Sequence, residues 1–233
     1  MTGTAPGRPN VLPAELTAFE DRFSTATTDI ELPGGTVRLF HPRNADDLIT
    51  EADYVMDERL PYWADIWPSS LALARSLASL APRPGRALEL GCGLGLVTIA
   101  ALRAGHDVVA TDYYADALLF TRRNAVTATG REPATRLANW RSWPADLGQF
   151  DLIVASDVLY EHAYAPLLAT IVATSLTAGG VAFIADPGRV ALDEFRIECA
   201  ACKLQIVERL KVPHQDGAIN QVITIHEVRR RTP

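Results

Sequence analysis

The sequence has 233 residues, enough for one domain with its own hydrophobic core. Its 22 basic and 28 acidic residues give a net charge of −6, which argues against a surface that coats nucleic acid, because phosphate binding relies on lysine and arginine. The N-terminus has no basic segment followed by an apolar core, and no apolar run approaches the ~20 residues that span a bilayer. We therefore expect a cytoplasmic monomer with no membrane or nucleic-acid partner.

The first sixty residues predict an extension of the main domain. Residues 1–12 are small, polar and rich in proline, which is typical of a loose tail. Residues 28–40 form two strand-like halves around a Pro-Gly-Gly turn, which predicts a β-hairpin. We assign 1–60 to an N-terminal tail and hairpin packed on the core, and 61–233 to the main domain.

From residue 71 onward, strand-like and helical segments alternate along the chain. Strands are expected at 86–90, 107–111, 134–138, 150–155 and 180–185, and helices at 71–80, 95–104, 114–128, 164–176 and 190–202. Such alternation builds βαβ crossovers and a mostly parallel sheet with helices on both faces. The last two strands, 204–211 and 219–229, have only a loop at Pro213–Gly217 between them, so they should pair antiparallel. The fold class is therefore α/β: a doubly wound, mostly parallel seven-stranded sheet that ends in an antiparallel hairpin.

The glycine-rich turn after the first of these strands is the most informative motif. Glu89 is the next-to-last residue of this strand. Gly91, Gly93 and Gly95 follow at every second position, before a helix. A strand, a glycine turn and a helix together bring backbone close to a nucleoside cofactor. A dinucleotide site would need its third glycine where Leu96 stands, and Glu89 would repel a pyrophosphate. A cationic cofactor without phosphate, such as S-adenosylmethionine, fits better; the alternative is a tight turn that binds nothing.

The ends of the next two strands carry side chains suited to a nucleoside. Asp112 comes about 20 residues after the glycines, where a carboxylate can accept both ribose hydroxyls. Its alternative role is the N-cap of the following helix. Asn139 and Trp140 follow the short third strand, where the indole can pack on an adenine ring and Asn139 can bond the edge of that ring. The alternative is a half-buried loop aromatic, which we prefer for Trp143.

The strand at 150–155 leads into a segment where an acceptor would meet the transferred group. Asp157 and Tyr160 lie three residues apart there, so they share a face if the segment turns helically. The alternative is a cap for the helix at 164–176. His162 is near this segment, but a surface or capping role explains it better.

Neither metal nor disulfide chemistry is expected. The five histidines are scattered, and no clustered set of His, Cys and Asp ligands is evident, so we expect no metal. The three cysteines do not form a disulfide framework. Cys199 and Cys202 fall on one face of a predicted helix, which favours a buried structural role.

Together these motifs resemble the class I, seven-β-strand S-adenosylmethionine-dependent methyltransferases over roughly residues 60–229. The Asp-x-x-Tyr motif at 157–160 and the Pro-Tyr-Trp-Ala and Trp-Pro motifs at 61–68 are similar to a protein-lysine methyltransferase group, and most of all to enzymes that modify the β subunit of electron-transfer flavoprotein. The resemblance implies a Rossmann-like fold, S-adenosylmethionine as cofactor and a protein lysine as methyl acceptor. The side chains and glycines that it implies around the cofactor are Trp67, Glu89, Gly91, Gly93, Asp112, Trp140 and Ser156. By the same resemblance, Asp157 and Tyr160 act at the acceptor.

Three other functions stay open. The nearest is a small-molecule N-methyltransferase, because the same cofactor half serves many acceptors. A second is an NAD-dependent oxidoreductase, against which Leu96 and Glu89 count. A third is a non-catalytic binding module that keeps the fold, against which the Asp157 and Tyr160 pair counts.

Overall fold

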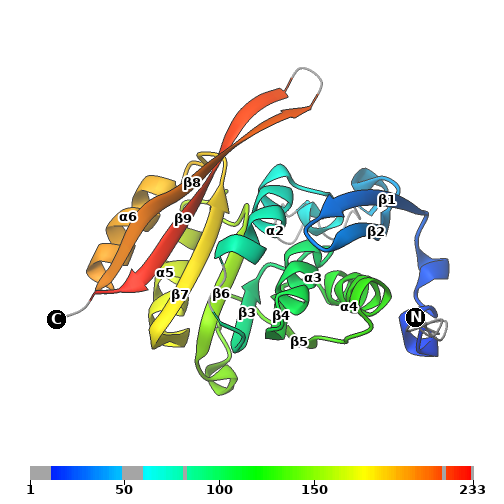
Figure 1. Ribbon diagram of the computed structural model, residues 1–233, viewed down its shortest axis with the longest axis horizontal. Helices are drawn as coiled ribbons and strands as arrows, with labels where there is room; N and C mark the ends of the chain where they lie inside the picture. The colour runs from blue at the N-terminus through cyan, green and yellow to red at the C-terminus, as the bar shows by residue number, and fades with distance from the viewer. Residues whose placement is uncertain (1–11, 49–59, 81–82, 217–218, 232–233) are drawn as a thin grey trace, which may run out of the picture.

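The computed structural model describes residues 12–48, 60–80, 83–216 and 219–231. Its body is a seven-stranded sheet in the order β5-β4-β3-β6-β7-β9-β8, with helices packed on it (Figure 1). The strands are β3 (Arg86–Leu90), β4 (Asp107–Asp112), β5 (Ala134–Leu137), β6 (Phe150–Ser156), β7 (Leu176–Asp186), β8 (Leu204–Asp216) and β9 (Ile219–Arg230). The helices are α2 (Pro68–Leu80), α3 (Leu96–Arg103), α4 (Ala115–Thr129), α5 (Tyr164–Ser175) and α6 (Leu192–Ala201). Strands β3 to β7 run parallel, and β9 is antiparallel to both neighbours, which confirms the predicted fold class.

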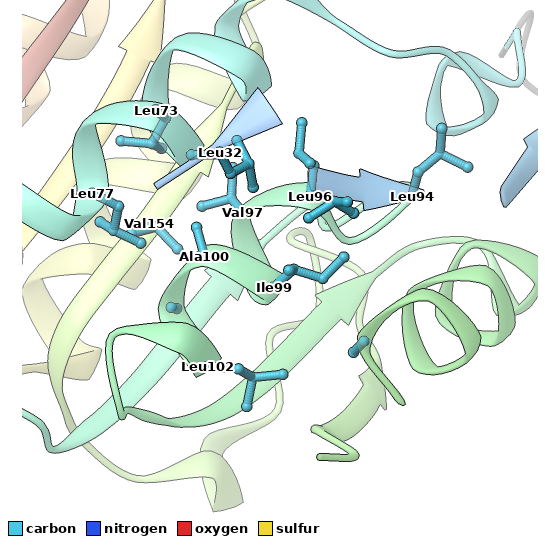
Figure 2. Packing of buried hydrophobic residues seen from close by; sticks show 14 of the residues in the cluster. Leu32, Leu73, Leu77, Leu94, Leu96, Val97, Ile99, Ala100, Leu102 and Val154 are labelled. Carbon is cyan, nitrogen blue, oxygen red and sulfur yellow. The ribbon is translucent and has the colours of Figure 1, made fainter. Parts of the chain in front are cut away.

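Apolar residues on both sides of the parallel strands explain why helices cover both faces of the sheet. In β6, Leu152 and Val154 belong to the core shared with α2, α3 and α4, whereas Ile153 and Ala155 belong to the core shared with α5 and α6. All four side chains are fully buried. A strand that is apolar on both sides requires such a layer on each face. Figure 2 shows the first of these cores, where Val154 lies among side chains of α2 and α3.

Helix α2 and strand β7 both begin earlier than expected. Helix α2 begins at Pro68, before the expected residue 71, because proline suits the first turn of a helix. Residue Leu176, expected at the end of a helix, instead begins β7 and pairs with Phe150. Its side chain is fully buried. An apolar residue at a helix end satisfies either pattern, so its pairing in the sheet decides the boundary.

The C-terminal hairpin is longer than expected. The prediction of a loop at Pro213–Gly217 is wrong for residues 213–216, because β8 continues through Pro213, which pairs with Val222, and ends at Asp216; Gly217 lies outside the described residues. Strand β8 is the edge of the sheet, and a proline is tolerated at an edge, where a missing N–H need not break a ladder. Beyond the sheet, β8 and β9 project as a two-stranded ribbon (Figure 1).

The predicted N-terminal hairpin is confirmed as β1 (Thr25–Leu32) and β2 (Gly35–Pro42), which pair antiparallel. Asn124 of α4 holds it against the core. The Asn124 amide donates to the carbonyls of Phe40 (2.8 Å) and Leu94 (2.9 Å), and its Oδ1 accepts the N–H of Phe40 (2.9 Å). The Phe40 ring stacks on Phe120, with 5.4 Å between ring centroids.

Other expectations about the chain are met in part. The predicted tail, 1–12, lies outside the described residues except for its last position, and the division of the chain at residue 60 stays a prediction. Cys199 is a fully buried free thiol in α6, and Cys202 is a half-buried one at the end of that helix. Within the ranges that the structure describes, no helix is long and apolar enough to cross a membrane.

Candidate active site

A cavity of about 430 Å³ lies at the carboxyl ends of the central strands. From β3 the chain proceeds to β4 and β5 on one side, whereas β6 and β7 lie on the other side. Ligand sites of open α/β sheets form at such a change of direction, because the loops on either side diverge. All but one of the predicted site residues line this cavity; they are Trp67, Glu89, Gly91, Gly93, Asp112, Asn139, Trp140, Ser156, Asp157 and Tyr160.

The exception, Gly95, serves helix packing. The backbone is left-handed at all three glycines of the turn, with φ of +70° at Gly91, +51° at Gly93 and +82° at Gly95. A Cβ on Gly95 would lie 2.9 Å from the backbone and side chain of Thr121 in α4. Gly95 therefore lets α3 begin close to α4, while Gly91 and Gly93 present bare backbone to the cavity.

Glu89 is a buried carboxylic acid in the cavity wall. Its exposed fraction is 1%, and its Oε2 accepts a hydrogen bond from the Thr98 hydroxyl. Burial raises the pKa of Glu89 to about 8; the nearby Asp112 adds to this effect, and the Thr98 hydrogen bond opposes it. The ligand-free protein therefore keeps Glu89 mostly protonated at neutral pH, and a bound cation would favour its ionised form.

Asp112 shapes the turn between β4 and α4. Its Oδ2 accepts the N–H of Gly93 (2.9 Å), and its Oδ1 accepts the N–H of Tyr114 (3.0 Å). Helix α4 begins after Tyr114 without a side-chain cap, so the alternative role of Asp112 as the N-cap is not seen. Burial raises the pKa of Asp112, and the backbone donors oppose that rise. The backbone N–H of Tyr113 is a third donor to this carboxylate. A carboxylate has about four acceptor sites, so it can still accept a ligand hydroxyl.

Trp140 and Asn139 lie at the cavity wall beyond β5. Trp140 is half-buried and meets Tyr164 edge-on, with 5.0 Å between ring centroids. Its ring also lies beside Gly91, where an added Cβ would come within 3.6 Å of the indole. The Asn139 Oδ1 accepts the N–H of Arg141 (2.9 Å), so this side chain stabilises its own turn. Trp143 is half-buried against the second core, as the sequence predicts.

Asp157 adopts an unusual backbone conformation at the end of β6. Its φ is +60°, a left-handed value that costs a non-glycine residue roughly 1–3 kcal/mol. The Asp157 N–H donates to the carbonyl of Ala185 in β7 (3.0 Å), which holds the residue in place. The segment does not turn helically, so the expected reason for Asp157 and Tyr160 to share a face is wrong. Both residues nevertheless line the same cavity.

Two partners of Asp157 were not anticipated from the sequence. The Ser69 hydroxyl donates to its Oδ2 (2.8 Å), and Nε of Arg189 pairs with its Oδ1 (2.5 Å). The Arg189 guanidinium also lies 5.4 Å from the ring centroid of Trp67. Arg189 follows the end of β7, in the sequence Asp-Pro-Gly-Arg. The rule that ligands sit at strand carboxyl ends, applied to this strand as well, would have identified it.

Aromatic side chains surround the outer part of the cavity. Tyr160 meets Tyr62 and Tyr164 edge-on, with 5.4 Å and 5.2 Å between ring centroids. Tyr62 is 40% exposed and in turn contacts Trp67. Burial raises the pKa of Tyr160, so its phenol stays neutral over the physiological range. These tyrosines offer apolar ring faces and hydroxyl groups to a ligand.

The charged groups of the cavity wall are mainly acidic. The carboxyl groups that line it belong to Asp65, Glu89, Asp112, Asp157 and Glu161, and the guanidinium groups belong to Arg141 and Arg189. Such a wall suits a ligand with positive charge and hydroxyl donors, and it disfavours a pyrophosphate beside the glycine turn. In the described part of the chain, no three His, Cys, Asp or Glu side chains are grouped to hold a metal. His162 is exposed and pairs with Glu194 (3.0 Å).

Comparisons with known proteins show the family and the fold of the chain. Residues 66–227 match the family model described as a methyltransferase domain. The electron transfer flavoprotein beta subunit lysine methyltransferase of Xenopus laevis is 32% identical over 197 residues, covering 80% of this chain and 78% of the relative. The enzyme of the same name from Danio rerio is 34% identical over 149 residues, covering 59% and 54%. The crystal structure of ribosomal protein L11 methylase from Lactobacillus delbrueckii subsp. bulgaricus aligns with a TM-score of 0.57 at 22% identity, covering 72% of this chain and 81% of that one, which shows the shared fold.

Proposed function

The chain belongs to the methyltransferase domain family, and we propose that it methylates the side-chain amine of a lysine in a partner protein. It is an S-adenosylmethionine-dependent methyltransferase. The observation that carries the lysine proposal is the Asp157 carboxylate, which is buried in the cavity beside Tyr160 and beyond the glycine turn. A second support is the likeness over four-fifths of the chain to an enzyme whose name states a lysine acceptor.

We assign the cofactor to the end of the cavity formed by the glycine turn. Asp112 can accept the ribose hydroxyls with its carboxylate oxygens, and Trp140 can cover the adenine ring. Glu89 can stabilise the cationic end of the cofactor once its proton leaves. Gly91 and Gly93 line the cavity without side chains, so the cofactor can approach their backbone. These roles fit a nucleoside that carries positive charge and no phosphate.

We assign the acceptor to the opposite end, near Asp157 and Tyr160. Bound S-adenosylmethionine would supply a methyl group on a sulfonium. A neutral amine nitrogen would bond to that methyl carbon in line while the carbon–sulfur bond breaks, and S-adenosylhomocysteine would be the leaving group. Catalysis of that displacement depends mainly on positioning the amine and excluding water. Asp157 can hold the amine through a free carboxylate lone pair, and the neutral Tyr160 hydroxyl and ring can orient it. The exposed Tyr62 marks the rim through which a lysine side chain enters.

Tritiated S-adenosylmethionine tests the proposal directly. The protein is incubated with it and with purified electron-transfer flavoprotein of the host, and separately with a host lysate. Mass spectrometry then locates the label. We expect label on a lysine of a protein and none with the Asp157→Asn variant.

The other outcomes identify the alternatives. Label confined to small metabolites would favour a small-molecule N-methyltransferase. Binding of NAD in place of S-adenosylmethionine would favour an oxidoreductase. Binding of S-adenosylmethionine with no label transferred to anything in the lysate would favour a non-catalytic module.

A further inference from the structure

Arg189 occupies a fixed position at the acceptor end of the cavity. Its backbone N–H and that of Gly188 both donate to Oδ1 of the fully buried Asp186, at 2.8 Å and 2.7 Å. Two residues after Arg189, the N–H of Ala191 donates a hydrogen bond to the carbonyl of Leu159 (3.2 Å), which connects this loop to the loop that contains Asp157. The Arg189 side chain is 36% exposed and lines the cavity. The loop therefore holds a cation against the Asp157 carboxylate.

An amine acceptor creates an electrostatic conflict at such a carboxylate. A carboxylate without a counter-charge favours the ammonium form of a nearby lysine, and an ammonium has no lone pair with which to accept a methyl group. The same carboxylate is needed to aim the amine. A cation that offsets its charge would resolve the conflict.

We propose that Arg189 is a positioning residue that fixes and neutralises the Asp157 carboxylate, so that this carboxylate orients the acceptor amine without retaining the amine's proton. The proposal rests on the proposed function, because it assumes an amine acceptor at Asp157. In the structure, Nε of Arg189 engages one carboxylate oxygen and the Ser69 hydroxyl engages the other, which fixes the plane of the carboxylate. Each oxygen keeps a lone pair toward which an amine N–H can point.

The other charged groups around this pair make the counter-charge more important. Titratable groups face the cavity from the segment before α2, from β3 and β4, from the segments after β3, β4 and β6, and from α5, and Asp186 lies beneath the Arg189 loop. They are Asp65, Glu89, Cys92, Asp112, Glu161, Asp186, Tyr62, Tyr113, Tyr114, Tyr160 and Tyr164. Each of them is neutral or negative. Arg141 lines the cavity from the loop after β5. Within the described residues, Arg189 is the basic side chain paired with Asp157.

The pH dependence of methylation tests the proposal. The protein, its Arg189→Met and Arg189→Lys variants and an Arg196→Met control are assayed for kcat/KM on host electron-transfer flavoprotein from pH 6 to 10. Arg196 pairs with Asp193 and Glu208 outside the cavity. In Arg189→Met we expect the midpoint of the rise in activity to move up by about one pH unit, which is about a tenfold loss at neutral pH that high pH restores. Arg189→Lys and Arg196→Met should keep the midpoint. A loss that is equal at every pH would overturn the proposal.

A binding measurement supplies a readout that needs no turnover. Calorimetry at pH 7 with n-butylammonium chloride, in the presence of S-adenosylhomocysteine, should show about tenfold tighter binding to Arg189→Met than to the unmodified protein, because the carboxylate has lost its counter-charge. Arg189→Gln serves as a second neutral variant should the methionine variant fail to fold. Equal or weaker binding would overturn the proposal. Tighter binding without any lysine methylation by the unmodified protein would instead refute the proposed function alone.

Discussion

Replacing Glu89 by glutamine is expected to stabilise the ligand-free protein increasingly as the pH rises. Below pH 4.5 the carboxyl group is protonated in the folded and unfolded states alike. Between pH 4.5 and about 8 the unfolded chain releases this proton while the folded protein keeps it, because burial raises the pKa of Glu89. Rising pH therefore favours the unfolded state by about 1.4 kcal/mol for each pH unit, which amounts to roughly 3 kcal/mol at pH 7 and roughly 5 kcal/mol above pH 8. Glutamine cannot ionise, so the variant lacks this penalty.

Urea denaturation of the ligand-free protein at pH 5, 7 and 9 measures the effect. Glutamine at position 89 can still accept the Thr98 hydrogen bond, so the substitution changes mainly the ionisation. Glu198→Gln, which alters a helix residue outside the cavity lining, is the control. We expect Glu89→Gln to differ little from the unmodified protein at pH 5 and to exceed its free energy of unfolding by several kcal/mol at pH 9. Parallel stabilities across this range would refute the reasoning about Glu89.

Three further outcomes are expected. Asp112→Ala should weaken S-adenosylmethionine binding roughly 30- to 100-fold by calorimetry, because charge-assisted hydrogen bonds to a buried group are lost; the exposed Asp116→Ala is the control, and unchanged affinity would contradict the ribose role. Asp157→Asn should lower kcat/KM for methylation at least ~100-fold while cofactor affinity stays within about threefold, since the residue acts on the acceptor; a collapse of cofactor affinity with normal turnover would reverse that assignment. Gly95→Ala should cost roughly 2–4 kcal/mol in thermal or urea unfolding, because its Cβ would meet the α4 backbone at 2.9 Å and its φ is +82°. Gly35→Ala, with φ +112° and nothing within 4 Å, should cost only the strain, so equal losses would exclude the steric explanation.

Much of the cavity could be predicted from the sequence, because a parallel sheet converts chain order into spatial order. Successive strands of a doubly wound sheet end along one edge, so side chains that follow β3, β4 and β6 gather there whatever their distance along the chain. This placed Glu89, Asp112 and Asp157 around one cavity. The roles that we assign to these residues remain predictions for the experiments above.

The features that were missed depend on backbone dihedrals and side-chain conformations. The pairing of Asp157 with Arg189 joins residues 32 positions apart through two loops, and it depends on the left-handed φ of Asp157. Residue patterns report periodicity and turns but not such a dihedral. The edge position of β8 likewise allowed Pro213 to stay in a strand, and strand order within a sheet is not encoded locally.

The contacts of Asn124 bear on how this protein can change during evolution. One buried amide binds both the hairpin strand at Phe40 and the carbonyl of Leu94 in the glycine turn. The N-terminal hairpin is therefore part of the same polar network as the turn assigned to the cofactor. Loss or exchange of the hairpin would remove the two hydrogen bonds between Asn124 and Phe40, and a donor or acceptor left buried without a partner costs about 1–3 kcal/mol. A substitution on the exposed face of the hairpin leaves these bonds intact, whereas a change at its inner edge also affects the support of the glycine turn.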